Sequence, residues 1–245
     1  VRSHDEYLRA REEGLHACLP SIQGGNALEG APGGPADVPA NSIVRVTLLH
    51  LTNSVYGATS SPLHLLRREK GLTDEGRSLV EQLNACRVFV DLAHIHPRGF
   101  WDAVEVHDSS QPLLVTHTGV SGVRPHWRNL DDGQLKAVAD TGGVTGIVFE
   151  TNYLRRPPGP CTAETVIEHV AHVVETVGED HVGIGWDFDG AITPPRELAD
   201  GSRFPVLVGG MLARGWSPER IRKILGGNFL RCLAELRPTA SGLPG

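Results

Sequence analysis

The chain has 245 residues, of which 40% are hydrophobic and 21% charged, and it carries a formal net charge of -6. This length is enough for one large domain with a full core, and it matches the ~250 residues of a single (β/α) barrel. The absence of a basic block argues against nucleic acid as the main partner. The absence of an apolar run of ~18 residues excludes a transmembrane helix from this sequence.

The four cysteines indicate a reducing compartment. Cys18, Cys86, Cys161 and Cys232 are scattered along the chain without a CxxC pair, which excludes a zinc ribbon or a thioredoxin motif. Reduced thiols are typical of cytosolic proteins, and the sequence carries no signal-peptide pattern. We therefore expect a cytoplasmic protein that has no membrane partner.

Apolar runs and helical patterns alternate along the chain. We predict strands over residues 15–22, 43–50, 87–93, 112–117, 144–149 and 181–187. We predict helices over residues 3–14, 60–70, 73–85, 98–107, 131–140, 162–177 and 204–214, and two more that begin at 217 and, after a turn at Gly226-Gly227, at 228. Thr73, Thr162 and Ser217 are expected to cap three of them, and Leu79, Val80 and Leu83 recur at helical spacing in the helix over 73–85. This alternation predicts βα units and a parallel sheet. We expect residues 1–236 to form one (β/α) barrel domain and residues 237–245 to form a disordered tail.

Four of the predicted strands end in a histidine or an aspartate. His50, His94 and His117 close three of them, and Asp187 closes the strand in the stretch His181-Val-Gly-Ile-Gly-Trp-Asp-Phe-Asp-Gly190. In α/β folds, ligands and metals bind at the carboxyl ends of the strands. These four side chains are therefore the first candidates for a functional site.

His94 and His117 are candidate ligands of a divalent metal such as Zn²⁺, because imidazoles suit this ion. Asp187 is the third candidate, since a carboxylate can serve both as a ligand and as a proton shuttle. The alternative is structural. In that interpretation the two histidines form separate hydrogen bonds at the sheet edge, and Asp187 caps a helix, a role for which Asp189 is better suited.

His50 and Arg128 are candidates for contacts with a substrate. His50 is expected to donate a hydrogen bond to an oxyanion that develops during a reaction, and its alternative role is that of a hydrogen-bonded structural histidine. Arg128 is expected to bind a substrate carboxylate in bidentate fashion, and its alternative role is a surface arginine paired with Asp131 or Asp132. The remaining histidines are interpreted as structural or surface residues: His16, His64, His96, His107, His126, His169 and His172.

A set of short motifs, taken in order over residues ~15–236, resembles the membrane (renal) dipeptidase family. These motifs are Leu49-His50-Leu-Thr-Asn53, Gly71-Leu-Thr73, Asp91-Leu-Ala-His94, Thr116-His-Thr118, Arg128-Asn-Leu, Gly142-Gly-Val, the stretch from His181 to Gly190, and Gly226-Gly-Asn-Phe-Leu-Arg231. Members of this family are binuclear zinc peptidases of the amidohydrolase type. Their fold is a (β/α)₈ barrel and their substrates are dipeptides or dipeptide-like amides.

The resemblance implies a role for each matching residue. His94 and His117 would bind one zinc ion, and Asp187 would bind the other and act as the proton shuttle. His50 and Asn53 would contact the substrate, His50 at the carbonyl that becomes tetrahedral, and Arg128 would bind the C-terminal carboxylate. The implied mechanism is attack of a metal-bridging hydroxide on the peptide carbonyl, with electrostatic stabilisation of the oxyanion.

Two departures from the family pattern affect the metal site. The family's first strand ends in His-x-Asp, which supplies two ligands, and this motif does not occur in the sequence. We therefore expect a barrel that is incomplete at its N-terminus. In addition, Gln23 stands in a Gln-Gly-Gly turn at the position of the family's bridging glutamate. A neutral amide is a poor bridge between two cations, so the expected number of bound zinc ions is one or none.

Three functions follow from this pattern. The first is a metal-dependent dipeptidase. The second is a dipeptidase-like pseudoenzyme that keeps a binding pocket, and the third is a diverged protein of a biosynthetic pathway with an impaired or mononuclear metal site. His50, His94, His117, Arg128 and Asp187 favour the first function, whereas Gln23 favours the other two. The open edges of an incomplete barrel also lead us to expect pairing with a second chain, as in a homodimer.

Overall fold

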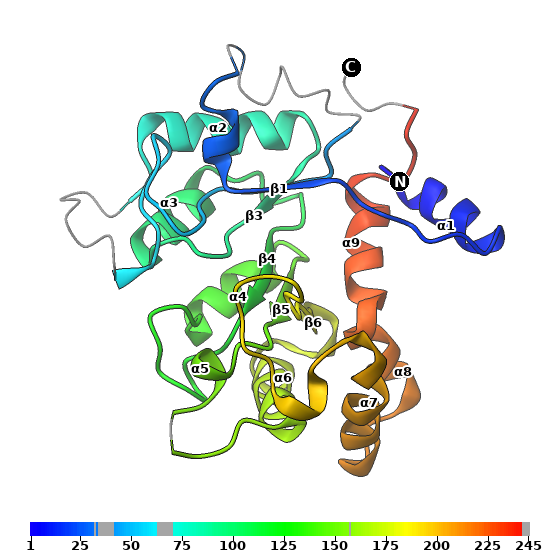
Figure 1. The fold of residues 1–245 in the computed structure, drawn as a ribbon. Helices are drawn as coiled ribbons and strands as arrows, with labels where there is room; N and C mark the ends of the chain where they lie inside the picture. Colours follow the sequence, from blue (N-terminus) through cyan, green and yellow to red (C-terminus); the bar gives the residue numbers. More distant parts are fainter. Residues whose placement is uncertain (32, 34–41, 63–70, 157, 242–245) are drawn as a thin grey trace. The chain divides into compact units, whose positions relative to one another are not determined.

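The computed structural model describes residues 1–31, 33, 42–62, 71–156 and 158–241. Within this part, the chain divides into two compact units (Figure 1). Unit 1 comprises residues 1–114 and 230–245, and unit 2 comprises residues 115–229. The predicted helix over residues 60–70 lies mostly outside the described residues. The prediction that residues 1–236 form a single domain stays a prediction.

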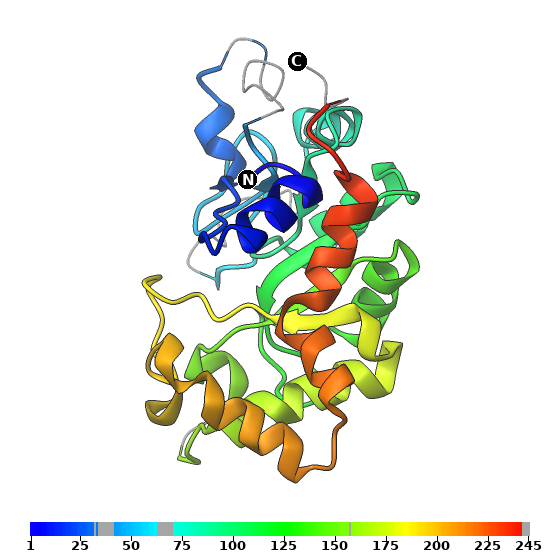
Figure 2. The ribbon, with the colours of Figure 1, turned by 90° about the vertical axis from the view of Figure 1, so that its right-hand side faces the viewer.

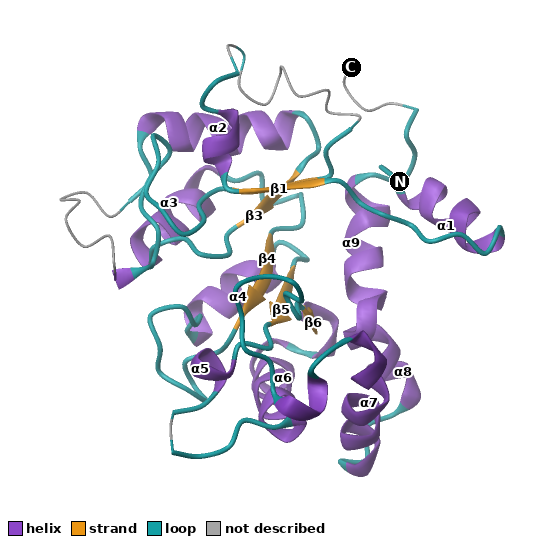
Figure 3. Cartoon of the chain, in the orientation of Figure 1, coloured by secondary structure: helices purple, strands orange, loops and turns teal. Residues whose placement is uncertain are grey.

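Six short parallel strands form the sheet, in the order of the sequence (Figure 3). They are β1 (Ser21–Gln23), β2 (Arg45–Thr47), β3 (Phe89–Asp91), β4 (Leu114–Thr118), β5 (Val144–Ile147) and β6 (Val182–Ile184). The α/β class and the six predicted strands are therefore confirmed. The strands are shorter than the apolar runs that predicted them, and four of the runs continue into the loop beyond the strand, those at residues 43–50, 87–93, 144–149 and 181–187.

The first strand is displaced from its predicted position. The apolar run at residues 15–22 predicted it, but β1 begins only at Ser21, and Leu15 is 60% exposed. The position of β1 is set by its pairing with β2, in which Ser21 is opposite Arg45 and Gln23 is opposite Thr47. Pairing between two segments is not visible in the hydrophobicity of either one.

Among the described residues of the N-terminal part of unit 1 are three α-helices, and a side chain caps the start of each. They are α1 (His4–Glu12), α2 (Asp74–Ala85) and α3 (Pro97–Val106), with a short 3₁₀ turn, η1 (Gly25–Leu28), after β1. Thr73 caps α2 as predicted, since its Oγ1 accepts a hydrogen bond from the Gly76 N–H. The buried face of α2 contains the predicted apolar residues Leu79, Val80 and Leu83.

Most of the remaining helices belong to unit 2. They are α4 (Asp132–Asp140), α5 (Thr151–Leu154), α6 (Ala163–Val177), α7 (Phe204–Ala213) and α8 (Pro218–Arg222), with short turns η4 (Glu179–His181), η5 (Arg196–Leu198), η6 (Gly201–Arg203) and η7 (Lys223–Gly227). Thr162 and Ser217 cap α6 and α8 as predicted. Helices α6 and α7 lie side by side (Figure 2), and no described helix is both long and apolar enough to cross a membrane.

The last helix, α9 (Asn228–Leu236), begins at the predicted turn and leads to a buried arginine. Arg237 has no exposed surface, and its guanidinium donates hydrogen bonds to the backbone oxygens of Arg2 (2.7 Å) and Arg87 (2.8 Å). The backbone oxygen of Arg237 accepts a bond from the N–H of His4. The next carbonyl, that of Pro238, accepts a bond from the N–H of Asp5, so the contacts of unit 1 include the first two residues of the predicted tail.

Candidate functional site

The first three strands end side by side in polar residues. In the register of the sheet, Gln23 of β1 is opposite Thr47 of β2, and Thr47 is opposite Asp91 of β3. Residues paired in this way point to the same face of a sheet, because side chains alternate between its two faces. Gln23, Thr47 and Asp91 therefore form a polar row at the carboxyl ends of three neighbouring strands, where α/β folds bind their ligands.

His94 lies in the turn that follows β3. Its backbone φ is +66°, in the left-handed region that residues other than glycine rarely adopt. The amide nitrogen of Gln23 lies 3.5 Å from its Nε2, and the ring of His50 packs edge-on against it with centroids 4.7 Å apart. The structure thus brings together three predicted site residues, Gln23, His50 and His94, within unit 1.

The hydroxyl of Thr59 connects the two histidine loops. Thr59 Oγ1 lies 2.6 Å from the backbone oxygen of His50 and 3.1 Å from that of His94. The Thr59 N–H in turn donates to Oδ1 of Asn53 at 3.0 Å. Asn53, predicted to contact the substrate, therefore uses its side-chain oxygen to fix the loop that joins His50 to His94.

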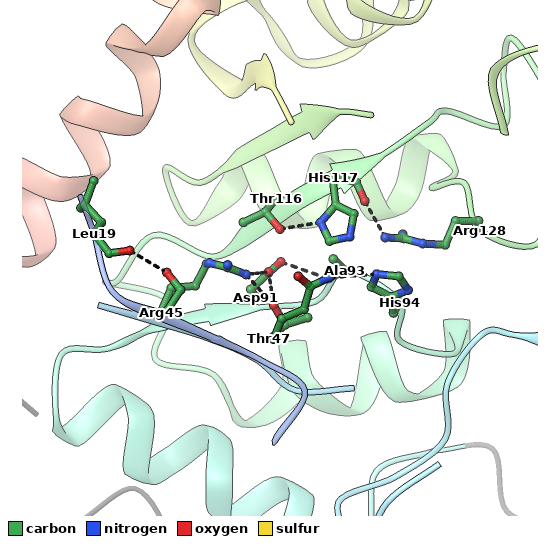
Figure 4. Close-up of polar contacts among 11 residues, drawn as sticks. Leu19, Arg45, Thr47, Asp91, Ala93, His94, Thr116, His117 and Arg128 are labelled. Atoms are coloured by element: carbon green, nitrogen blue, oxygen red, sulfur yellow. Dashed lines mark hydrogen bonds and ion pairs between the residues drawn. The ribbon is translucent and has the colours of Figure 1, made fainter. Parts of the chain in front are cut away.

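His117 lies within β4, at the start of unit 2, and is 6% exposed. Its Nδ1 is 2.9 Å from the hydroxyl of Thr116, and its backbone oxygen accepts a 2.6 Å hydrogen bond from Nη2 of Arg128 (Figure 4). Such a contact at one ring nitrogen helps to orient the imidazole.

Arg128 is a buried residue, which corrects the alternative interpretation of a surface arginine. It is 4% exposed, and its backbone oxygen accepts a hydrogen bond from the hydroxyl of Thr118. The two aspartates of that alternative interpretation have other contacts: Asp131 caps α4 in a capping box, and Oδ1 of Asp132 lies 2.7 Å from Nε2 of His172. A buried guanidinium beside the end of β4 agrees with a role in binding an anion.

Asp187 occupies a strained turn after β6. Its φ is +61°, and that of Asp189 is +64°. The residues on either side of Asp187, Trp186 and Phe188, stack on each other with ring centroids 6.0 Å apart. Asp187 and Asp189 both lie in a loop where no helix begins, which corrects the alternative interpretation of either residue as a helix cap.

The loop after β5 adds residues that the sequence pattern did not single out. Glu150 is 5% exposed, and its carboxylate accepts hydrogen bonds from the backbone N–H groups of Asn152 (2.9 Å) and Thr193 (2.6 Å). The only available signal was a glutamate directly after the strand predicted over residues 144–149. Glu150 therefore fixes the loop after β6 against the loop after β5, both of which begin at strand ends.

Three aromatic rings pack together in unit 2. His126 lies 4.9 Å from both Trp127 and Tyr153, measured between ring centroids. Burial raises the pKa of Tyr153, and the charge of Asp187 also raises it, whereas that of Arg128 lowers it. Burial, together with the charge of Arg128, lowers the pKa of His126. The charges of Arg128 and Asp187 thus act in opposite directions on the Tyr153 hydroxyl.

The predicted metal ligands fit a single divalent metal by donor type. Two imidazoles and a carboxylate, His94, His117 and Asp187, are groups that zinc prefers. No three His, Cys, Asp or Glu side chains of the described residues are already grouped around a metal-sized position. The amide of Gln23 provides no anionic oxygen for a second metal. Metal binding by these residues stays a prediction.

Comparison with known proteins places these residues in the context of a peptidase family. The family described as membrane dipeptidase (peptidase family M19) matches residues 1–244 of the chain. The dipeptidase tcpJ of Claviceps purpurea is 36% identical over 203 residues, which are 82% of this chain and 46% of tcpJ. An uncharacterized protein from the pqqA 5' region of Klebsiella pneumoniae is 38% identical over 169 residues, which are 68% of this chain and 61% of that protein. The chain therefore spans less than two thirds of the length of either relative.

A solved structure gives the same result for the fold. It is a metallo peptidase from Rhodobacter sphaeroides, liganded with a phosphinate mimic of the dipeptide L-Ala-D-Ala, and its TM-score is 0.87 at 29% sequence identity. The similarity covers 96% of this chain and 68% of that protein. This similarity confirms the barrel-type α/β fold class that the sequence motifs implied.

Proposed function

Because the chain belongs to the membrane dipeptidase family, peptidase family M19, we propose that it hydrolyses the amide bond of a dipeptide in a metal-dependent reaction. The named dipeptidase among its relatives and the dipeptide mimic bound to the similar peptidase both support this function. The structural observation that best supports this function is the backbone conformation of His94 and Asp187. Both residues lie just after strands in a left-handed conformation, and such strain persists mainly at functional sites.

Each site residue has a chemical role in this reaction. His94, His117 and Asp187 would hold the metal, which when bound would supply Lewis-acid activation of the peptide carbonyl. Arg128 binds the C-terminal carboxylate of the dipeptide through paired N–H donors. His50 donates a hydrogen bond to the carbonyl oxygen as water attacks the carbonyl carbon, and Asp187 takes a proton from that water and passes it to the amine that leaves as the C–N bond breaks.

Gln23 favours a second candidate function, a binding protein that keeps the pocket without hydrolysis. Its amide lies against His94 Nε2, the nitrogen that would face a metal. A neutral amide at this position weakens the attraction for a cation compared with a carboxylate. In that case the chain would bind a dipeptide through Arg128 and His50 and release it unchanged.

Dipeptide hydrolysis and dipeptide binding can be measured on the same sample. The chain is incubated with zinc and a set of dipeptides, release of free amino acids is followed, and binding is measured by calorimetry. Turnover that a chelator abolishes is the result expected for a dipeptidase. Dipeptide binding without turnover at every zinc concentration would contradict the dipeptidase function and support the binding protein.

A further inference from the structure

A closed hydrogen-bond network lies directly beneath the His94 turn. Thr47 of β2 and Asp91 of β3 are paired in the sheet, and Arg45 precedes Thr47 by two residues, so all three share one face. Nη1 of Arg45 donates to Asp91 Oδ2 (2.5 Å) and to Thr47 Oγ1 (2.5 Å), and Thr47 Oγ1 donates to the same Oδ2 (2.6 Å) (Figure 4). One carboxylate oxygen of Asp91 is therefore fixed by two neighbouring side chains.

The other carboxylate oxygen of Asp91 shapes the chain that follows. Asp91 Oδ1 accepts a 3.1 Å hydrogen bond from the N–H of Ala93, which is the pattern of an Asx turn. This turn reverses the backbone at the end of β3, and the next residue, His94, has φ +66°. The bond from Asp91 thus immobilises the peptide group immediately before the unusual conformation.

The peptide group after His94 is held as well. The His94 carbonyl accepts hydrogen bonds from the N–H of Ser60 (2.7 Å) and from Thr59 Oγ1 (3.1 Å). With Ala93 held on one side and the His94 carbonyl on the other, the left-handed conformation is determined from both directions. A conformation that costs roughly 1–3 kcal/mol needs such support to persist.

From this geometry we propose that Arg45, Thr47 and Asp91 are positioning residues that set the placement of the His94 imidazole. The role of that imidazole as a metal ligand rests on the proposed function, whereas the hydrogen-bond network does not. Asp91 has no exposed surface, and removing a carboxylate from water costs several kcal/mol. Apolar residues would fill the same space without this cost, whereas only an ionised carboxylate both accepts from Arg45 and Thr47 and bends the chain at Ala93.

Thr47→Val tests the network with the smallest change of shape. It removes the hydroxyl that Asp91 accepts from and keeps the volume. Thr47→Ser restores the hydroxyl, and Thr145→Val is the matched control, since Thr145 is an equally buried threonine on another strand of the sheet. Two signals are read by NMR in the chain as purified: the ring resonances of His94 and the exchange rate of the Ala93 amide.

Thr47→Val is expected to shift the His94 ring signals and to accelerate Ala93 exchange about tenfold or more. Thr47→Ser and Thr145→Val are expected to leave both as they are. Unchanged His94 and Ala93 signals in a folded Thr47→Val chain would overturn the proposal, and so would equal changes in the Thr145→Val control. These readouts need no substrate, so a failure of the proposed dipeptidase function would be detected separately, as absence of turnover by the unaltered chain.

If the unaltered chain turns over dipeptides, the same variants give a kinetic readout. Thr47→Val is expected to lower kcat by about 10–100-fold, the usual effect of removing support for a metal ligand, with little change in KM. A general loss of stability would instead reduce the active fraction in both valine variants. Equal kcat values for Thr47→Val and Thr145→Val would contradict the positioning role.

Discussion

The amide of Gln23 is predicted to limit the affinity of the candidate site for a cation. It lies 3.5 Å from Nε2 of His94, so a carboxylate at this position would add a negative charge beside the predicted metal. An interaction of about 4 kcal/mol is typical of unit charges ~4 Å apart near a protein surface, which is enough for an affinity gain of tenfold or more. Gln23→Glu is therefore expected to bind zinc at least about tenfold more tightly, measured by competition with a chelator.

A charge-matched variant separates this local effect from a change in net charge. Gln82 is exposed on α2, so Gln82→Glu adds the same charge away from His94 and should leave the zinc affinity unaltered. Equal affinities of Gln23→Glu and the unaltered chain would show that the amide is not what limits the site.

Arg128 is predicted to discriminate dipeptides by their free carboxylate. Arg128→Lys keeps the charge but loses the forked donor geometry, and hydrogen bonds to charged groups contribute about 1.5–3 kcal/mol each. The expected result is a fall of about 10–100-fold in kcat/KM for free dipeptides and little change for C-terminally amidated ones. Arg124→Lys, in the same loop, is the control, and an equal fall for amidated substrates would contradict carboxylate binding.

The candidate residues lie at strand ends as predicted, but the sequence did not reveal the contacts that support them. His50, His94, His117 and Asp187 all lie within or just after strands, as their patterns predicted. Thr59, in contrast, joins two histidine loops through backbone contacts with residues 9 and 35 positions away. Such contacts depend on where distant segments meet, so no local sequence pattern predicts them.

At the scale of whole elements, a buried histidine joins α6 to two loops. His169 has no exposed surface; its Nδ1 accepts from the N–H of Val120 (3.0 Å), and Nε2 lies 3.0 Å from the Leu154 oxygen. Nδ1 can accept only while the ring is neutral. Burial lowers the pKa of His169 to about 4, compared with about 6.5 in an unfolded chain.

This depressed pKa predicts an acid-sensitive fold. Between pH 6.5 and 4 the unfolded state binds more protons than the folded state, so stability is complete above about pH 6.5 and decreases as the pH falls towards 4. The loss attributable to His169 is at most about 3 kcal/mol. His169→Gln, which has no proton to gain, is expected to show a flatter dependence of unfolding free energy on pH in urea titrations. If the unfolding free energies of the unaltered chain and of His169→Gln changed in parallel with pH, His169 would not be the source of the acid sensitivity.

The helices were easier to predict than the strands. Thr73, Thr162 and Ser217 each cap the helix that their sequence pattern predicted, because a cap and its helix are neighbours in the chain. The strand at residues 15–22 was displaced to Ser21–Gln23, because a strand begins where a partner strand is available. Local chemistry therefore predicts helix ends better than strand ends.

At the scale of the whole molecule, Arg237 ties three distant segments of unit 1 together. Its guanidinium donates to the oxygens of Arg2 and Arg87 with Nε and Nη1, and burial lowers its pKa to about 10. Arg237→Lys offers one nitrogen in place of two and leaves a buried carbonyl without its donor. A loss of about 1–3 kcal/mol in unfolding free energy is expected. A change within experimental error in chemical denaturation would contradict the proposed structural role.

Candidate residues occur in each of the two compact units. Gln23, His50, Asn53 and His94 belong to unit 1, whereas His117, Arg128 and Asp187 belong to unit 2. The order of the family motifs along the sequence predicted this set. It could not predict how the two departures, Gln23 and the absent His-x-Asp motif, alter the chemistry, because that depends on the metal affinity of the residues that remain.

The most direct test of the account is the rate of dipeptide hydrolysis measured as zinc is added stepwise to the chelator-treated chain. A zinc-dependent dipeptidase with one metal site is expected to show no turnover without zinc and a rate that rises to a plateau at about one zinc ion per chain. The same titration of His94→Ala, in a chain that remains folded, should give no turnover. No hydrolysis at any zinc ratio, or equal rates for the unaltered chain and His94→Ala, would contradict the proposal that this chain is a metal-dependent dipeptidase.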